Sequence, residues 1–143
     1  MSQLAFRYQY DGTPKLVLDD FGRLEMQVTT EARSGQGGFW VQWQDVKEFG
    51  ETLGTFPILE EKPISAEWGY TENGLYERVL SVTIAPADAR ARLSVRVDIA
   101  DEHDPSDRVR ATFQTSYADL SAFQIEVAKL MAGEIEQAIL RGE

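Results

Sequence analysis

The residues best suited to chemistry lie in one short acidic stretch in the second half of the chain. Its only histidine, His103, stands there among Asp101, Glu102, Asp104 and Asp107. An imidazole beside closely spaced carboxylates can hold a hard divalent cation or transfer protons near neutral pH. A calcium loop needs a glycine at its sharp turn, however, and this stretch has none. We therefore interpret the stretch as a solvated hairpin loop and predict no metal ligand and no catalytic role for His103.

Other routes to catalysis have little support in the sequence. The chain has no cysteine, which excludes a disulfide, a thiolate nucleophile and a thiolate metal site. No serine stands in a Gly-x-Ser-x-Gly elbow. Residues 34–38 contain three glycines, but no lysine or helix start follows at the spacing that a phosphate-binding loop requires. The sequence thus predicts a flexible loop at 34–38 and a protein without catalytic residues or a cofactor.

Recognition of a partner has better support, and Trp40 is its main candidate. If Phe39, Val41 and Trp43 face the core of a strand, Trp40 must point to the opposite face. An outward tryptophan among polar side chains often anchors an interface. Alternatively, Trp40 packs beneath a further layer, such as the N-terminal strand.

The acidic loop completes the set of candidate partner-binding residues. Its concentrated negative charge would speed association with a basic protein. The full set is Trp40, Asp101, Glu102, Asp104 and Asp107.

These residues must be positioned by strands and helices, of which the clearest lie between Arg108 and Leu130. Apolar residues alternate with polar ones up to Tyr117, which indicates a half-buried strand. From Leu120 the apolar residues recur at steps of three and four, which predicts a helix over about 120–141. We expect Ser121 and Gln124 to form a capping box, with Leu120 packed against Ile125.

The same strand-to-helix corner occurs 74 residues earlier and predicts a short helix over about 45–53. The matched residues are Phe39, Trp43, Asp45, Val46, Phe49 and Leu53, followed by Phe113, Tyr117, Asp119, Leu120, Phe123 and Val127. Leu24, Met26 and Val28 match Val95, Val97 and Ile99 at an offset of 71, as a hairpin loop three residues longer in the second copy would produce. We predict one domain, 1–143, built by an internal duplication of 3–54 and 64–141. The alternative is that every such corner needs an aromatic residue, a cap and an apolar stripe.

The fold class follows from the remaining alternating segments and turns. Asn73-Gly74 is the strongest hairpin signal in the chain. Strands are expected at about 3–10, 15–18, 24–30, 39–43, 64–70, 80–84, 93–99 and 108–117. Short connections favour antiparallel pairing, so we predict an α+β fold. It would be a meander of about eight strands, arranged as a ββββα duplication with both helices on one face. One sheet or two packed sheets would both satisfy this pattern.

Charge narrows the choice of partner. The 143 residues carry a formal net charge of −10, which disfavours nucleic acid and anionic membranes because both are polyanions. A basic protein is the natural converse, although acidic charge also serves solubility alone. The N-terminus has no signal-peptide pattern and no stretch approaches the roughly 20 apolar residues of a membrane span. We expect a cytoplasmic protein.

Together these patterns resemble the layout of small bacterial proteins grouped with wall-associated-toxin immunity proteins and related uncharacterised families. The shared features are a hairpin, a strand with an aromatic residue, an acidic cap, and Phe and Leu spaced along a helix, present twice between Leu16 and Met131. The acidic loop 101–107 departs from that layout. The resemblance implies a non-enzymatic cytoplasmic protein that binds and blocks a cognate toxin. The competing hypothesis is a small-molecule-binding protein or enzyme with a pocket between sheet and helices.

Overall fold

A computed structural model describes residues 1–10 and 21–143, and it confirms the α+β prediction with two antiparallel four-stranded sheets and two helices. The first sheet has the order β3-β2-β1-β8 and the second β4-β5-β6-β7. In the first sheet the strands are β1 (Ser2–Tyr10), β2 (Phe21–Thr29), β3 (Ser34–Gln42) and β8 (Ala138–Gly142). In the second they are β4 (Ile64–Glu72), β5 (Leu75–Pro86), β6 (Arg92–Ala100) and β7 (Arg108–Ser116). The strand expected at 15–18 lies outside the described residues.

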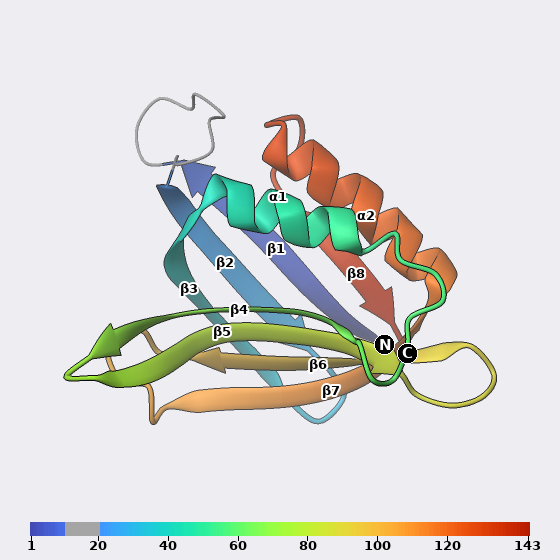
Figure 1. Cartoon of the computed structure of the whole chain (residues 1–143), viewed down its shortest axis with the longest axis horizontal. Coiled ribbons are helices and arrows are strands. Elements are labelled where there is room, and N and C mark those ends of the chain that lie inside the picture. Colours follow the sequence, from blue (N-terminus) through green and yellow to red (C-terminus); the bar gives the residue numbers. More distant parts are fainter. Residues whose placement is uncertain (11–20) are drawn as a thin grey trace.

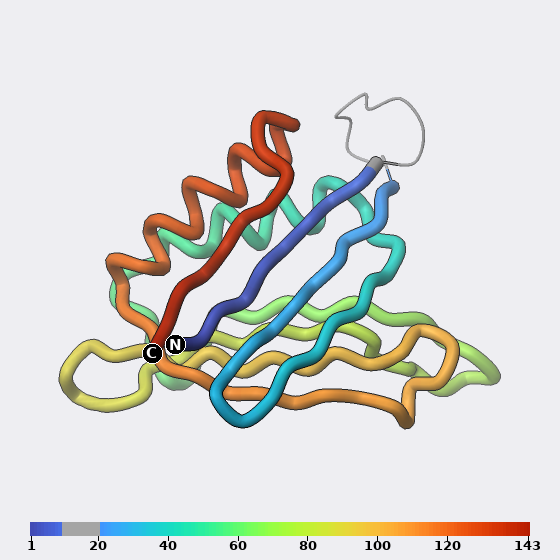
Figure 2. Tube along the Cα trace, turned by 180° about the vertical axis from the view of Figure 1, so that it is seen from behind, coloured from blue at the N-terminus to red at the C-terminus, as the bar shows by residue number. Residues whose placement is uncertain are grey.

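Helices α1 (Trp43–Thr52) and α2 (Tyr117–Met131) lie side by side over one face of the first sheet (Figure 1). The strands of the first sheet run steeply across those of the second (Figure 2). The two sheets pack against each other and the helices pack against the first sheet, and the buried residues of all these elements form one hydrophobic core.

Aromatic rings fill the centre of that core. Phe6 of β1 stacks on Phe49 of α1 with ring centroids 6.0 Å apart and meets Phe123 of α2 edge-on at 5.4 Å. Phe49 also meets Trp68 of β4 edge-on at 6.3 Å. All four side chains are buried. The space between sheet and helices, where a ligand pocket was an alternative, is thus occupied by side chains at this level.

The second helix differs from the prediction at both ends. Its N-cap is Ser116, not Ser121: the Ser116 hydroxyl accepts a hydrogen bond from the Asp119 backbone N–H at 3.1 Å and donates one to the Asp119 carboxylate at 3.1 Å. Ile125 is 57% exposed and lies well inside α2, so the packing predicted between Leu120 and Ile125 does not belong to the N-terminus of this helix.

The predicted continuation of α2 to residue 141 is wrong. The helix ends at Met131, and Gly133 follows with φ of 77°, a left-handed conformation that glycine adopts at little cost. The chain then returns as β8, with Ala138 and Leu140 buried against β1. Apolar residues in this short segment fit helical steps as well as alternation, so their spacing alone favoured the helix.

The glycine-rich segment 34–38 is also corrected, because it is the first half of β3 and the hairpin turn is 30–33. A Cβ added at Gly35 would lie 2.8 Å from Val109 Cβ, and one at Gly37 would lie 2.7 Å from Ile99 Cγ2. These contacts are too close for ordinary side chains. The glycines allow β3 to cross the second sheet at close range.

The two matched halves have the same pairing register. Leu24 pairs with Phe39 in the first β-hairpin, and the corresponding Val95 pairs with Phe113 in the second. Strand β8 lies beside β1 as β4 lies beside β5, so the C-terminal segment supplies the fourth strand of the first sheet. This arrangement accords with the duplication, which stays a prediction.

Candidate protein-binding surface

Trp40 lies on the outer face of the first sheet, as predicted, and no described layer covers it. Its side chain is 47% exposed, whereas Val41 and Trp43 are buried. Phe21 at the start of β2 is 51% exposed. Phe21 pairs with Gln42, and Arg23 pairs with Trp40, so Phe21 and Trp40 are diagonal neighbours on one face. The sheet therefore presents two large aromatic side chains side by side.

The acidic segment 101–107 is the hairpin loop that the sequence predicted. Asp101 N–H donates to the Asp107 carbonyl at 2.8 Å and closes the loop. The Asp101 carboxylate accepts from the backbone N–H groups of His103 and Asp104, and the Asp104 carboxylate accepts from Ser106. Two of the candidate carboxylates thus shape the turn, while the Asp107 side chain makes no hydrogen bond or ion pair with any described residue.

Glu102 joins this loop to the aromatic face. Its carboxylate accepts a 2.7 Å hydrogen bond from Arg23 Nη2, and both side chains are largely shielded, with 21% and 28% exposed. The hydrogen bond that Arg23 donates to Glu102 raises the pKa of Arg23. Burial acts to lower this pKa, and the negative charges of Glu102 and Glu25 act to raise it. Since Arg23 stands opposite Trp40, the structure brings Trp40 and the acidic loop onto one surface.

Gly38 makes room for this contact. A Cβ at that position would come within 3.0 Å of Arg23 Nε, so the guanidinium lies across the glycine. Arg23 was not predicted as a site residue. The register of the β2–β3 hairpin would have placed it opposite Trp40, but its ion pair with a loop 79 residues away has no local signal.

A hollow of about 200 Å³ separates the loop from β2 and β3, and His103 and Asp107 are among its lining residues. The described residues include no group of three or more His, Cys, Asp or Glu side chains arranged to hold a metal ion.

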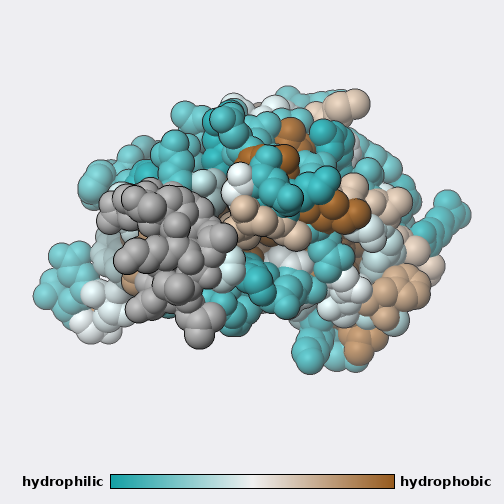
Figure 3. Space-filling view, turned by 90° about the horizontal axis from the view of Figure 1, so that it is seen from above, coloured by the Kyte–Doolittle hydropathy of each residue, from teal (hydrophilic) through white to brown (hydrophobic). Residues whose placement is uncertain are grey.

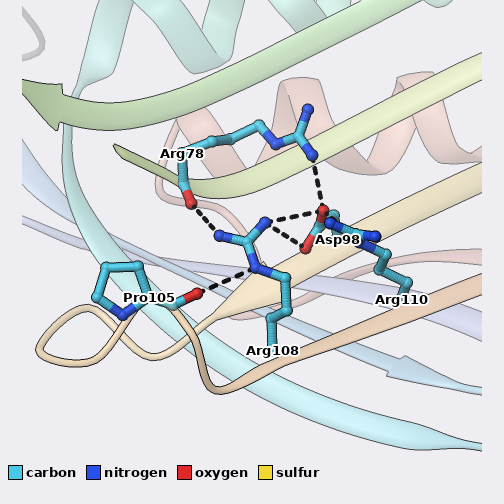
Figure 4. A network of polar contacts seen from close by, with 5 residues as sticks. All are labelled: Arg78, Asp98, Pro105, Arg108 and Arg110. Carbon is cyan, nitrogen blue, oxygen red and sulfur yellow. Dashed lines mark hydrogen bonds and ion pairs between the residues drawn. The ribbon is translucent and has the colours of Figure 1, made fainter. Parts of the chain in front are cut away.

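A second polar cluster on the outer face of the second sheet was missed by the sequence analysis. Asp98 on β6 is 8% exposed, and its carboxylate contacts Arg78, Arg108 and Arg110 at 2.8–3.2 Å (Figure 4). Arg108 also donates to the carbonyls of Pro105 and Arg78, each at 3.0 Å. Arg108 is thereby a structural link between the acidic loop and β5.

A groove of about 390 Å³ lies between the outer sides of the two helices. Trp43, Val127 and Met131 give it a mainly apolar lining, and Lys47 lies over the Trp43 ring. Trp43 Nε1 donates to the Met131 carbonyl at 2.9 Å. In the view from the helix side, hydrophobic residues are exposed among polar ones (Figure 3).

Comparisons with protein-family models, curated proteins and solved structures find no match. Neither helix in the described part of the chain is long and apolar enough to cross a membrane.

Proposed function

We propose that this chain is a protein-binding module whose partner covers the aromatic pair Phe21 and Trp40 together with the acidic loop 101–107. The observation that carries the proposal is the exposure of both aromatic side chains on one face, bordered by Glu102. Tryptophan and other aromatic residues are enriched at the centres of interfaces, where they contribute much of the binding free energy.

The charge of this surface favours a basic partner. Asp101, Asp104 and Asp107 are exposed on the loop, and the chain has a net charge of −10. Complementary charge chiefly raises the association rate, and this effect weakens as salt screens it. In the narrower form of the proposal, the chain is a cytoplasmic, non-enzymatic inhibitor of a cognate toxin, as the immunity-protein resemblance implies.

A second candidate function uses the interhelical groove. Its apolar lining and size suit a small apolar ligand. Such a ligand would raise the melting temperature of the wild-type chain but not of Ala128→Trp, which fills the groove. This outcome, with no partner captured, would favour the second function.

The first proposal is tested by capture from native cell lysate at low and raised salt, with wild-type and Asp107→Lys chains as bait. Asp107 is the best loop position to change because its carboxylate makes no bond to a described residue, so the loop keeps its shape. We expect one basic protein that binds the wild type, is released by salt and is lost with Asp107→Lys. Glu61→Lys is the matched control, since Glu61 is exposed outside this surface. Equal capture by the wild-type and Asp107→Lys chains would refute a role for the loop.

A further inference from the structure

The outer edge of the second sheet is open along part of β7. This strand is the last of its sheet, and the Gln114 carbonyl accepts a hydrogen bond from Glu143 N–H at 3.0 Å, so Gln114 directs its backbone groups away from β6. Alternate residues of an antiparallel strand direct their backbone groups to the same side. The N–H and C=O groups of Arg110 and Thr112 therefore also point outward, and no described segment pairs with them.

A hollow of about 500 Å³ lies next to this edge. Its lining residues come from the β2–β3 turn and from β7: Thr30, Ala32, Arg33, Arg110, Ala111 and Thr112. Figures 1 and 2 both place that turn beside β7. Both charged lining residues are arginines and no carboxylate contributes to the lining.

Positive charge exceeds negative charge among the residues that line the hollow, while Glu31 is exposed in the same turn. Asp98 is shared by three guanidinium groups, of which Arg110 uses only Nε and is 71% exposed. Its terminal nitrogens contact no described acceptor. The guanidinium groups of Arg33 and Arg96 likewise make no hydrogen bond or ion pair with a described residue. Arg96 pairs with Thr112 across the hairpin. Together with Arg33 and Arg110 it forms a cationic strip along this edge.

We propose that the β7 edge binds an extended acidic segment of another protein by strand addition. The backbone of the segment would pair with Arg110 and Thr112, while its carboxylates would approach Arg33 and Arg110. The whole chain, at −10, repels acidic molecules. Binding at this edge must therefore combine the local cationic strip with backbone hydrogen bonds. This site lies on the second sheet and is separate from the Trp40 surface.

The first test measures fluorescence anisotropy of a labelled eight-residue peptide of alternating threonine and glutamate, titrated with the full chain at low salt. We expect saturable binding that Arg110→Gln weakens at least tenfold, because Asp98 keeps Arg78 and Arg108 and the fold is retained. Arg90→Gln makes the same charge change in the β5–β6 turn and should leave the affinity unchanged. Charges on an edge strand can instead prevent that strand from pairing with another chain. Absence of saturable binding would indicate this role and overturn the proposal.

The second test separates strand addition from attraction between charges. Thr112→Pro removes one outward N–H without changing charge or breaking the β6–β7 ladder, and proline is tolerated on sheet edges. We expect this variant to lose at least tenfold in affinity, with circular dichroism unchanged. A peptide of equal charge with a central proline should also bind more weakly to the wild type. Unchanged affinity in either experiment, or equally tight binding of oligothymidylate, would overturn strand addition.

Discussion

Asp98 shows how a single buried residue organises the second sheet. Its carboxylate receives hydrogen bonds from arginines on β5 and β7, so it connects three adjacent strands across their outer face. A carboxylate withdrawn from water is favourable only when paired, and the surrounding guanidinium groups supply those partners.

Asp98→Asn should therefore destabilise the fold. The amide keeps the shape of the side chain but removes the negative charge that holds three cations together, and we expect a loss of about 3 kcal/mol. Urea unfolding would show this as a lower midpoint with an unchanged slope. Glu51→Gln breaks only an exposed pair with Lys47 and should cost less than about 1 kcal/mol. Equal midpoints for the two variants would contradict the role of Asp98.

The candidate site was partly predictable at the residue scale. Strand alternation placed Trp40 outward, and the acidic composition of 101–107 placed the loop in water, because both depend on local pattern. The Arg23–Glu102 contact depends on how two sheets cross, which no local pattern encodes. Phe21 lies before the strand predicted at 24–30, so its position beside Trp40 was missed.

At the scale of elements, α2 shows that the start of a helix depends on the last residue of the preceding strand. Ser116 ends β7 and caps α2 at once, which makes the strand-to-helix corner abrupt. Ser121 lies within the first turns of the helix and is exposed.

Replacement of the two serines distinguishes the observed cap from the expected one. Ser116→Ala should cost about 1 kcal/mol because the Asp119 N–H loses its acceptor. Ser121→Ala should be neutral or slightly stabilising, since alanine has the higher helix propensity. Thermal unfolding of both variants provides the measurement. A larger loss for Ser121→Ala would contradict the assignment of the cap.

The crossing of β3 over the second sheet depends on glycine. Gly35→Ala would place a Cβ 2.8 Å from Val109 Cβ, and relieving this overlap should cost about 1–3 kcal/mol in unfolding free energy. Gly54→Ala is the control, because its nearest neighbour is the end of the Gln124 side chain. Chemical denaturation should rank Gly35→Ala as the less stable variant. The opposite rank would show that the sheets do not require close approach at Gly35.

Most elements could be predicted because the spacing of their apolar residues matches the face that each element buries in the core. Asn73 and Gly74 both have positive φ, so the predicted hairpin forms as their conformational preferences require. Residues 34–38 were misassigned since glycine signals a loop and a close strand crossing equally well. Only the position of the second sheet distinguishes the two.

At the scale of the whole molecule, the chain closes on itself through β8. The C-terminal strand pairs with β1 near the N-terminus, and the Thr115 hydroxyl donates to the Arg141 carbonyl at 2.7 Å. The two sheets are thus linked at one end by the last residues of the chain. This closure was not predicted, because pairing between segments more than 130 residues apart leaves no trace in local spacing.

The molecule also separates its charges. The acidic loop and aromatic pair lie on one surface, while the arginine strip follows the edge of the second sheet. A protein of net charge −10 that retains a local cationic strip can offer different surfaces to basic and acidic partners.

The most direct test of the protein-binding proposal is the affinity of the captured partner for purified wild-type and Trp40→Ala chains, measured by isothermal titration calorimetry. We predict that Trp40→Ala weakens binding by more than 2 kcal/mol, which is more than about thirtyfold, as expected for a central aromatic anchor. Ile125→Ala, which removes an exposed apolar side chain from α2, should bind like the wild type. Equal affinity of Trp40→Ala and wild type would contradict the proposed surface.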